Sequence, residues 1–244
     1  MIKKITLNSI INKYYLGLNE SVKWVVKDKN LTIEFMTPTK DVIGRVTHSN
    51  FDIEDCELAI YDTKKLVNLL YICFYEVLIE LEKIKSLFTK LKISDKDFDV
   101  SYALADPLLI PKVGTVKVPE WDIELELKAT DVDNLIKAKT ALTGVDNMFI
   151  ETFISFNDEK ACSFIFGNDS GHNSNVTYQV VGKINNENIR IPFNSEMFKL
   201  ILQANKDMDG GKIFISEKGL MKFEFEKDGT YSEYFQVRLA ESNF

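Results

Sequence analysis

Apolar side chains recur at helical spacing in four stretches of the chain, about residues 7–16, 63–73, 131–143 and 196–206. Each stretch follows a short strand-like run and a residue type that favours helix N-termini, which predicts N-caps at Thr6, Asp62, Thr130 and Asn194. The third and fourth of these starts lie 124 and 132 residues after the first and second. A repeat of this length predicts two similar domains rather than one large core.

Most of the remaining chain alternates apolar and polar side chains, which is typical of antiparallel strands, and turn residues separate the runs. One hairpin is predicted where KDKN (residues 27–30) separates VKWVV from LTIEFMT. We therefore predict an α+β fold of two similar domains, residues 1–105 and 122–244, each with antiparallel sheets and two helices that cover a sheet face.

Residues 106–121 form the predicted connector between the domains. They contain three of the five prolines of the chain, and because proline cannot donate a ladder hydrogen bond, the segment is expected to be extended. The connector is also apolar at Leu108, Leu109, Ile110 and Val113. Two interpretations remain open, a strap that lies on a hydrophobic groove and a buried crossover.

The longest apolar stretch, residues 66–81, is interrupted by Glu76 and is shorter than the roughly 20 residues that span a bilayer. We interpret it as a helix that ends near Cys73, followed by a strand from about Tyr75 to Glu82. Neither a membrane partner nor a secretory signal is expected. The three cysteines, Cys56, Cys73 and Cys162, fit no disulfide framework or zinc site, and we expect them to be buried in a reducing compartment.

Charge is distributed unevenly along the chain. The net charge is −7, which argues against non-specific binding of nucleic acid by the whole surface. The four helical stretches, however, hold seven lysines and three acids, a net +4, which leaves −11 for the remainder. An acidic protein with cationic helices is suited to hold a polyanion on one surface and to repel it elsewhere. For any single helix the alternative is an ordinary solvated face, and Lys139 falls near an apolar stripe, where it must extend to the edge of its helix.

No catalytic residues, cofactor or metal site are predicted. The chain has no glycine-rich phosphate loop, no HExxH and no GxSxG. Its two histidines, His48 and His172, lie in polar, turn-like segments and are expected to be solvated. We therefore do not expect an enzyme.

Several segments, in order and spacing, resemble the sliding clamps of T-even-type bacteriophages. FDIEDCELAIYDTKKLVNLL has the AIYD that precedes the second helix in that family, and Ala105-Asp106-Pro107 opens the connector as it does there. ATDVDNLIKAKTALTGVD resembles the first helix of the family's second domain, and the terminal YSEYFQVRLAESNF resembles its last strand and tail. The resemblance spans nearly the whole chain.

The resemblance implies a closed homotrimeric ring of the DNA-clamp fold that encircles duplex DNA and tethers the replicative DNA polymerase, in the cytoplasm of an infected bacterial host. An ATP-driven clamp loader opens such rings, and a sigma-like late-transcription factor is a further partner. The strand before the connector, at about residues 99–105, is expected to pair with the strand at residues 176–183 of a neighbouring copy. The lysines expected to face DNA are Lys13, Lys64, Lys65, Lys137, Lys199 and Lys206, and the residues expected to bind partner peptides are Leu108, Leu109, Ile110 and Val113.

Two other functions remain open from the sequence. A monomeric DNA-polymerase accessory factor of the same fold would need a more strongly basic helix face than +4. A β-rich virion structural protein would leave the repeat and the helical lysines unexplained.

Overall fold

The computed structural model describes residues 2–154, 160–167 and 174–240, and the chain divides into two compact units. The first unit comprises Met1–Gly114 and Asp228–Ser232, and the second comprises Thr115–Lys227 and Glu233–Phe244. The division after Gly114 falls inside the predicted connector. His172 and the last four residues of the C-terminal segment lie outside the described residues.

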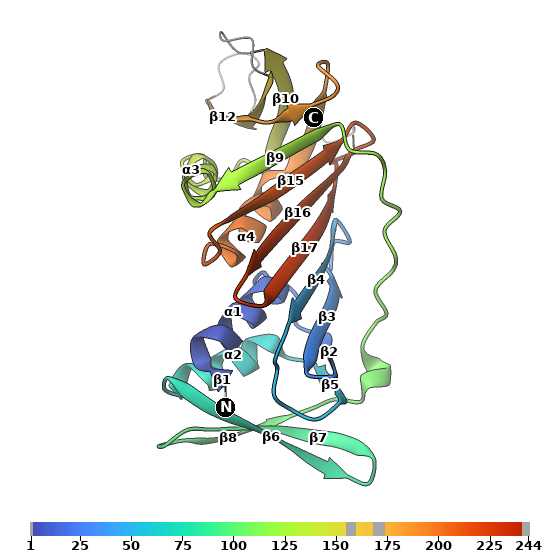
Figure 1. Cartoon of the computed structure of the whole chain (residues 1–244), viewed down its shortest axis with the longest axis vertical. Helices are drawn as coiled ribbons and strands as arrows, with labels where there is room; N and C mark the ends of the chain where they lie inside the picture. The colour runs from blue at the N-terminus through green and yellow to red at the C-terminus, as the bar shows by residue number, and fades with distance from the viewer. Residues whose placement is uncertain (1, 155–159, 168–173, 241–244) are drawn as a thin grey trace. The chain divides into compact units, whose positions relative to one another are not determined.

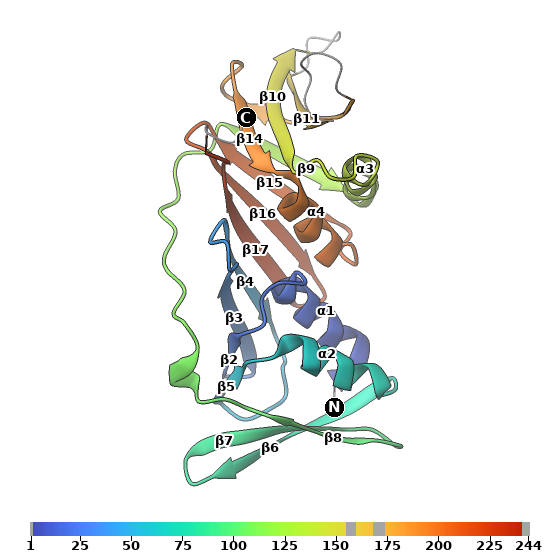
Figure 2. The same cartoon turned by 180° about the vertical axis from the view of Figure 1, so that it is seen from behind.

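The first unit combines two helices with two runs of antiparallel strands (Figure 1). The helices α1 (Lys4–Tyr15) and α2 (Thr63–Ile72) lie side by side, and α2 also packs against β8 (Figure 2). One sheet has the order β1 (Ile2–Lys3), β6 (Glu76–Ile84), β7 (Leu87–Ser94) and β8 (Asp99–Ala103). In the other run, β4 (Val42–His48), β3 (Asn30–Met36), β2 (Val22–Lys27) and β5 (Cys56–Ile60) follow one another.

The predicted hairpin forms because its turn and its alternation agree. Asp28 and Lys29 both adopt positive φ, the conformation of a two-residue turn whose twist matches the flanking strands. On β2, Val22, Trp24 and Val26 point into the core, and the residues between them point outward. The other side of this core is formed by α1, whose apolar side chains at positions 7, 10, 11 and 14 are fully buried.

The second unit repeats this plan, as the sequence predicts. Its helices are α3 (Ala129–Thr140) and α4 (Ser195–Ala204), which pack against each other. One sheet has the order β12 (Asn175–Val181), β11 (Lys160–Gly167), β10 (Asn147–Ile154) and β14 (Arg190–Asn194). The other run follows the order β13 (Lys183–Ile184), β9 (Ile123–Lys128), β15 (Gly210–Ser216), β16 (Leu220–Lys227) and β17 (Thr230–Val237).

Aromatic packing holds α4 to the strands of the second unit. The buried Phe198 ring lies 5.4 Å from the Phe164 ring, 6.1 Å from that of Phe166 and 5.6 Å from that of Phe223, between ring centres. Contacts of this kind favour tilted rings and add to the free energy of apolar burial.

Two of the four predicted N-caps are confirmed. Asp62 accepts a hydrogen bond from Lys65 N at 2.8 Å, and Asn194 accepts one from Met197 N at 2.9 Å. The predictions at Thr6 and Thr130 are wrong, because both residues lie inside their helices. The first helix starts earlier because Lys4 N donates to Tyr75 O at 2.9 Å, so this backbone donor is satisfied by tertiary structure. In α3, the Asp131 carboxylate accepts from Lys128 N at 2.8 Å.

Several smaller predictions can also be compared with the structure. The change from helix to strand after Cys73 is confirmed, since α2 ends at Ile72 and β6 begins at Glu76. The three cysteines are buried and unpaired. The expectation for His48 is wrong: it lies on β4, is buried, and its Nδ1 is 2.8 Å from the Thr230 hydroxyl in the same unit. Within the described part of the chain, every helix is too short or too polar to cross a bilayer.

Candidate functional site

Three of the predicted DNA-facing lysines are exposed and uncompensated. Lys64 and Lys65 lie in the first turn of α2, and Lys137 lies near the end of α3. None of them has an ion-pair partner among the residues that the structure describes. Such side chains can contact a phosphate without first breaking a contact within the protein.

The lysines of α4 and its surroundings are paired instead. Lys206 Nζ lies 3.0 Å from Asp133 Oδ1, and Lys199 pairs with Glu196 one turn earlier on α4. Burial raises the pKa of Glu196, but the hydrogen bonds and charges of Lys199 and Lys139 outweigh it and hold the pKa below its ordinary value. Lys139 is itself almost fully buried, and its Nζ reaches Glu196 Oε2 at 3.3 Å, which agrees with its predicted place at the edge of the helix.

Lys13 does not join the exposed set. Its side chain is fully buried, and its Nζ lies 2.7 Å from Ser9 Oγ in the preceding turn of α1. Because an ammonium group without solvent exposure is not accessible to a phosphate, the accessible candidates are Lys64 and Lys65 in the first unit and Lys137 in the second, where Lys199 and Lys206 are paired.

The connector crosses the outer face of the β2–β3 hairpin and forms a groove of about 550 Å³ with it. Ile110, Pro111 and Val113 line one side. The opposite side is formed by the outward-pointing residues of both strands, of which Val25, opposite Thr32 on β3, is the apolar member. Of the two interpretations of the connector, the groove agrees with a strap that lies over a sheet face, but that face is mostly polar rather than hydrophobic, with Val25 as its apolar residue.

Basic residues surround this groove. Lys23 is paired with Glu57 at 2.9 Å, and Glu34 is paired with Arg45 at 2.7 Å. Lys27 and Lys112 also line the groove, are exposed, and have no ion-pair partner within the described part of the chain. The groove therefore combines a few apolar side chains, Val25, Ile110 and Val113, with two positive charges that have no partner in the described part of the chain.

The four predicted partner-binding residues separate into two pairs. Ile110 and Val113 line the groove, whereas Leu108 and Leu109 belong to a short 3₁₀ turn, η1 (Pro107–Leu109), and are 90% and 75% exposed. The turn forms because the Asp106 carboxylate accepts a hydrogen bond from Leu108 N at 2.9 Å. The sequence did not predict Val25, Lys27 or Lys112, although outward positions on the predicted hairpin could have indicated the first two.

Within the described residues, each unit has an edge strand in the segment expected to pair between copies. In the first unit β8 is the last strand of its sheet, and in the second unit β12 has the same position. These strands, Asp99–Ala103 and Asn175–Val181, overlap the two segments expected to pair between copies, 99–105 and 176–183. An exposed strand edge is a template for pairing with another chain.

The side chains that the structure describes form no candidate metal site. No group of three or more histidine, cysteine, aspartate or glutamate residues in this part of the chain could hold a metal ion.

Comparison with known proteins identifies the fold. No protein-family model matches the chain, and no curated protein matches it. Among solved structures, it is similar to the PCNA of A. fulgidus in a complex with the C-terminal region of FEN-1, with 16% sequence identity, a TM-score of 0.78, and coverage of 99% of this chain and 98% of that chain.

Two further clamps give the same result. The Entamoeba histolytica proliferating cellular nuclear antigen matches with a TM-score of 0.73 and 13% identity over 98% of this chain and 96% of that one. The Thermococcus kodakaraensis PCNA matches with a TM-score of 0.75 and 12% identity over 98% of both chains. The chain therefore has the two-domain clamp fold predicted from its sequence.

Proposed function

We propose that this protein is a sliding clamp that encircles duplex DNA and tethers a replicative DNA polymerase for processive synthesis. The observation that carries the proposal is the clamp fold, which extends over 99% of the chain in the comparison with A. fulgidus PCNA. We further propose that the clamp is of the T-even bacteriophage type, because the sequence segments described above resemble that family. The protein would then act in the cytoplasm of an infected bacterial cell, as a non-enzymatic accessory factor.

The helices supply the DNA-facing surface in this proposal. Lys64, Lys65 and Lys137 contact phosphates weakly and without reading bases, as a sliding protein requires. The net charge of −7 keeps DNA away from the remaining surface. Because a closed ring is held on DNA by topology, a few weak contacts suffice.

Ring closure joins the two free edges head to tail. The β8 edge of one copy pairs with the β12 edge of the next, and three such junctions give a homotrimer. Each junction removes two unpaired edges, which is the reason that two otherwise unprotected strands can persist on the surface.

The groove beneath the connector is the proposed site for partner tails. Apolar side chains of a polymerase C-terminal peptide would contact Val25, Ile110 and Val113, and acidic groups of the peptide would pair with Lys27 and Lys112. The A. fulgidus structure contains the C-terminal region of FEN-1 on a clamp of this fold, which supports a C-terminal peptide as the ligand. A clamp loader and a sigma-like late-transcription factor are proposed to bind at the same site.

The test exploits topology. The protein is incubated with a linear duplex, both DNA ends are then blocked with bound streptavidin, and the complex is washed at high salt. A ring threaded on the duplex stays until a restriction enzyme cuts the DNA and is then released. Complete release by salt before cutting would contradict encirclement and favour the monomeric accessory factor, which a single-chain mass by sedimentation would support.

A further inference from the structure

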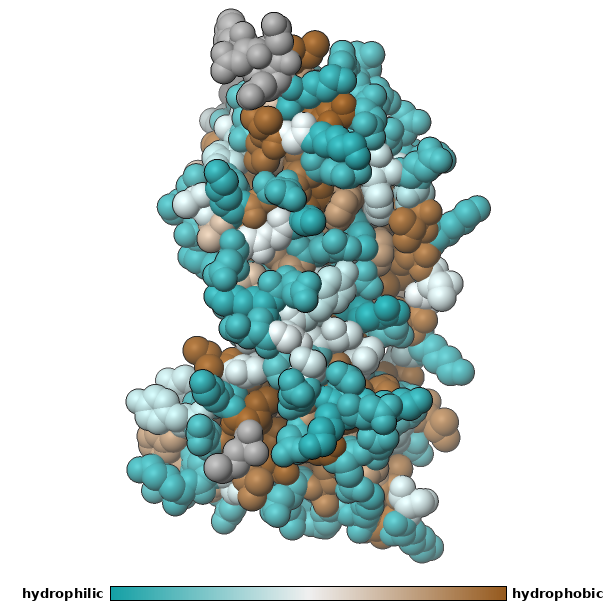
Figure 3. Space-filling view, in the orientation of Figure 1, coloured by the Kyte–Doolittle hydropathy of each residue, from teal (hydrophilic) through white to brown (hydrophobic). Residues whose placement is uncertain are grey.

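The helices of the two units differ in their acidic residues. The helices α1 and α2 contain none, whereas α3 contains Asp131 and Asp133 and α4 contains Glu196. Asp131 serves the fold, because its carboxylate accepts hydrogen bonds from Lys128 N and from the Tyr178 hydroxyl. Hydrophilic side chains cover most of the face shown in Figure 3, over both units. The helices are therefore distinguished by how their charges are paired.

In the first unit, the lysines of α2 keep their charge for other contacts. Asp62 and Glu20 lie at the start of this helix, but their carboxylates accept hydrogen bonds from the backbone N–H groups of Lys65 and Lys64, at 2.8 and 3.0 Å. Neither carboxylate forms an ion pair with the two lysine side chains, which are exposed.

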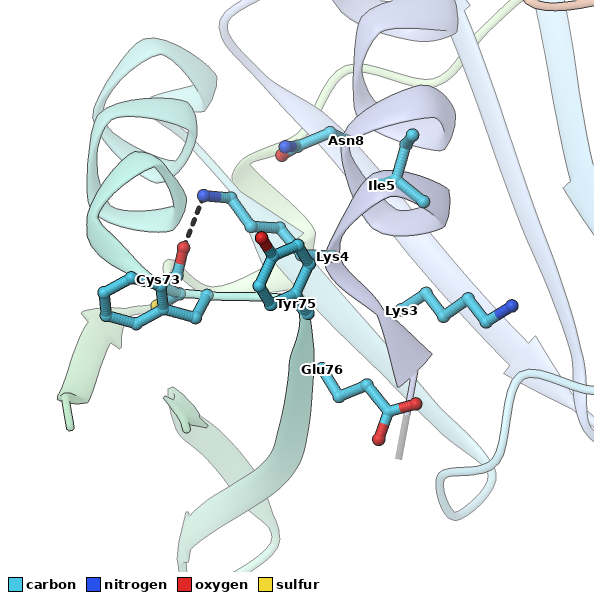
Figure 4. A pocket seen from close by; sticks show the side chains of 8 residues that line it. Lys3, Lys4, Ile5, Asn8, Cys73, Tyr75 and Glu76 are labelled. Carbon is cyan, nitrogen blue, oxygen red and sulfur yellow. Dashed lines mark hydrogen bonds between the residues drawn. The ribbon is translucent and has the colours of Figure 1, made fainter. Parts of the chain in front are cut away.

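A lysine of α1 is satisfied without any acid. Lys4 Nζ donates to Tyr71 O at 2.9 Å and to Cys73 O, beside a pocket of about 600 Å³ (Figure 4). These carbonyl groups lie at the C-terminal end of α2, where a lysine can satisfy the last carbonyls of a helix. No helix carboxylate therefore takes part in holding Lys4.

In the second unit, two helix carboxylates are paired with lysines. Asp133 Oδ1 lies 3.0 Å from Lys206 Nζ. Glu196 lies 2.5 Å from Lys199 Nζ through Oε1 and 3.3 Å from Lys139 Nζ through Oε2. Two lysines that could otherwise contact a phosphate, Lys199 and Lys206, thus already have a negative partner.

These ion pairs are placed where they affect binding more than folding. The side chains of Asp133 and Glu196 are 41% and 42% exposed, and ion pairs exposed to this degree contribute little to stability. A phosphate that approaches Lys206 must displace a carboxylate, so little favourable charge interaction is gained. Asp133 also lies one turn before Lys137 on α3, where opposite charges attract.

We infer that Asp133 and Glu196 weaken phosphate contact by the second unit and so set how readily the proposed clamp slides. The inference rests on the proposed function, and it adds acidic residues to a DNA surface so far described by its lysines. Weak contact favours sliding, because each step along the duplex must break the phosphate contacts of the previous position.

The test compares two variants of equal charge. The acid variant combines Asp133→Asn and Glu196→Gln. The matched control combines Glu151→Gln and Glu187→Gln, whose side chains are 41% and 46% exposed and whose ion pairs lie outside the helices of the same unit. Each variant loses two negative charges, so the net charge goes from −7 to −5.

Binding is measured by fluorescence anisotropy with an open-ended duplex over a series of salt concentrations. Release of Lys199 and Lys206 should add up to about −1.8 to the slope of log K against log salt concentration, for each subunit that touches DNA. Over a fourfold change of salt, this slope corresponds to roughly a 12-fold change in affinity. Tracking of single labelled clamps on stretched DNA should show slower diffusion of the acid variant, whereas the control should match the unmodified chain.

A single substitution keeps the test decisive if the acid variant folds poorly. Glu196 also neutralises Lys139, which is almost fully buried, whereas Asp133 pairs with the exposed Lys206. Asp133→Asn alone should therefore fold normally and give about half of the change in slope. Adding Lys206→Gln to this variant should remove the gain.

Three results would contradict the inference. Equal gains in the acid variant and the control would assign the effect to net charge. An acid variant that binds and slides like the unmodified chain would overturn the inference and leave the clamp intact. Release of the unmodified chain from an end-blocked duplex by salt, before the DNA is cut, would overturn both.

Discussion

Replacing the uncompensated helix lysines should weaken DNA contact without opening the ring. The helix variant combines Lys64→Glu, Lys65→Glu and Lys137→Glu. Each change alters the charge by −2, so the net charge goes from −7 to −13. A matched variant with Lys40→Glu, Lys85→Glu and Lys117→Glu, all exposed and outside the helices, reaches the same −13.

The magnitude follows from the number of phosphates contacted. Each neutralised phosphate contributes a slope of about −0.9 to log K against log salt concentration, so three contacts contribute about −2.7 for each subunit that touches DNA. Over a fourfold change of salt, this slope corresponds to roughly a 40-fold change in affinity. We expect the helix variant to lose this part of the slope and the matched variant to retain it.

The assay is fluorescence anisotropy with an open-ended linear duplex at a series of salt concentrations, with sedimentation of each variant as a control for assembly. A steeper salt dependence in the unmodified and matched chains than in the helix variant would support phosphate contact by α2 and α3. Equal losses in the two variants would refute the reasoning, because they would assign the effect to net charge at long range instead of to these lysines.

Four further changes test other parts of the structure. Lys27→Glu should weaken binding of an acidic hydrophobic peptide in a calorimetric titration and leave the melting temperature unchanged, because the side chain is exposed. Asp62→Ala removes an N-cap and should destabilise the first unit by about 1 kcal/mol in thermal unfolding, whereas Thr6→Ala, inside α1, should have little effect. Burial lowers the pKa of His48 in the folded protein. Its contribution to the free energy of unfolding is therefore fully present above the ordinary His pKa of about 6.5 and is lost as the pH falls toward the lowered pKa. Midpoints of urea unfolding should fall over this pH range, and His48→Gln should make that fall smaller. Phe198→Ala should cost about 3–5 kcal/mol in chemical unfolding.

The sequence predicted the fold well because its local signals agree with each other. For α2, the N-cap at Asp62 and the apolar positions Leu66 and Leu70 all point to one helix, and the buried side chains are those that the periodicity selects. For the β2–β3 hairpin, the alternation and the turn residues likewise point to one register. Where one signal stood alone, as with the threonines at helix starts, other contacts moved the boundary: the Tyr75 carbonyl at the start of α1 and the Asp131 carboxylate at the start of α3.

The candidate site was predicted less completely, since accessibility depends on packing that local patterns do not encode. Lys13 occupies a polar position on the helical wheel, but the structure buries it. The apolar run from Leu108 to Val113 looks uniform in sequence, yet the turn held by Asp106 directs its first two residues to solvent and its later ones to the groove. Phe74 and Phe98 lie far apart in the sequence, and the Asp95 hydrogen bonds and the stacking of the two rings bring them together.

The burial of the three cysteines makes this chain convenient for site-specific labelling. Burial raises the pKa of Cys56 and of Cys162 to about 12, and burial also raises the pKa of Cys73. Because the thiolate is the reactive form, a raised pKa leaves these thiols almost entirely protonated and unreactive near neutral pH. A maleimide dye should therefore react almost entirely with a cysteine introduced at an exposed position such as Leu108, with the native cysteines retained. Donor and acceptor dyes placed there on different copies would report subunit exchange and opening of the proposed ring by energy transfer in real time.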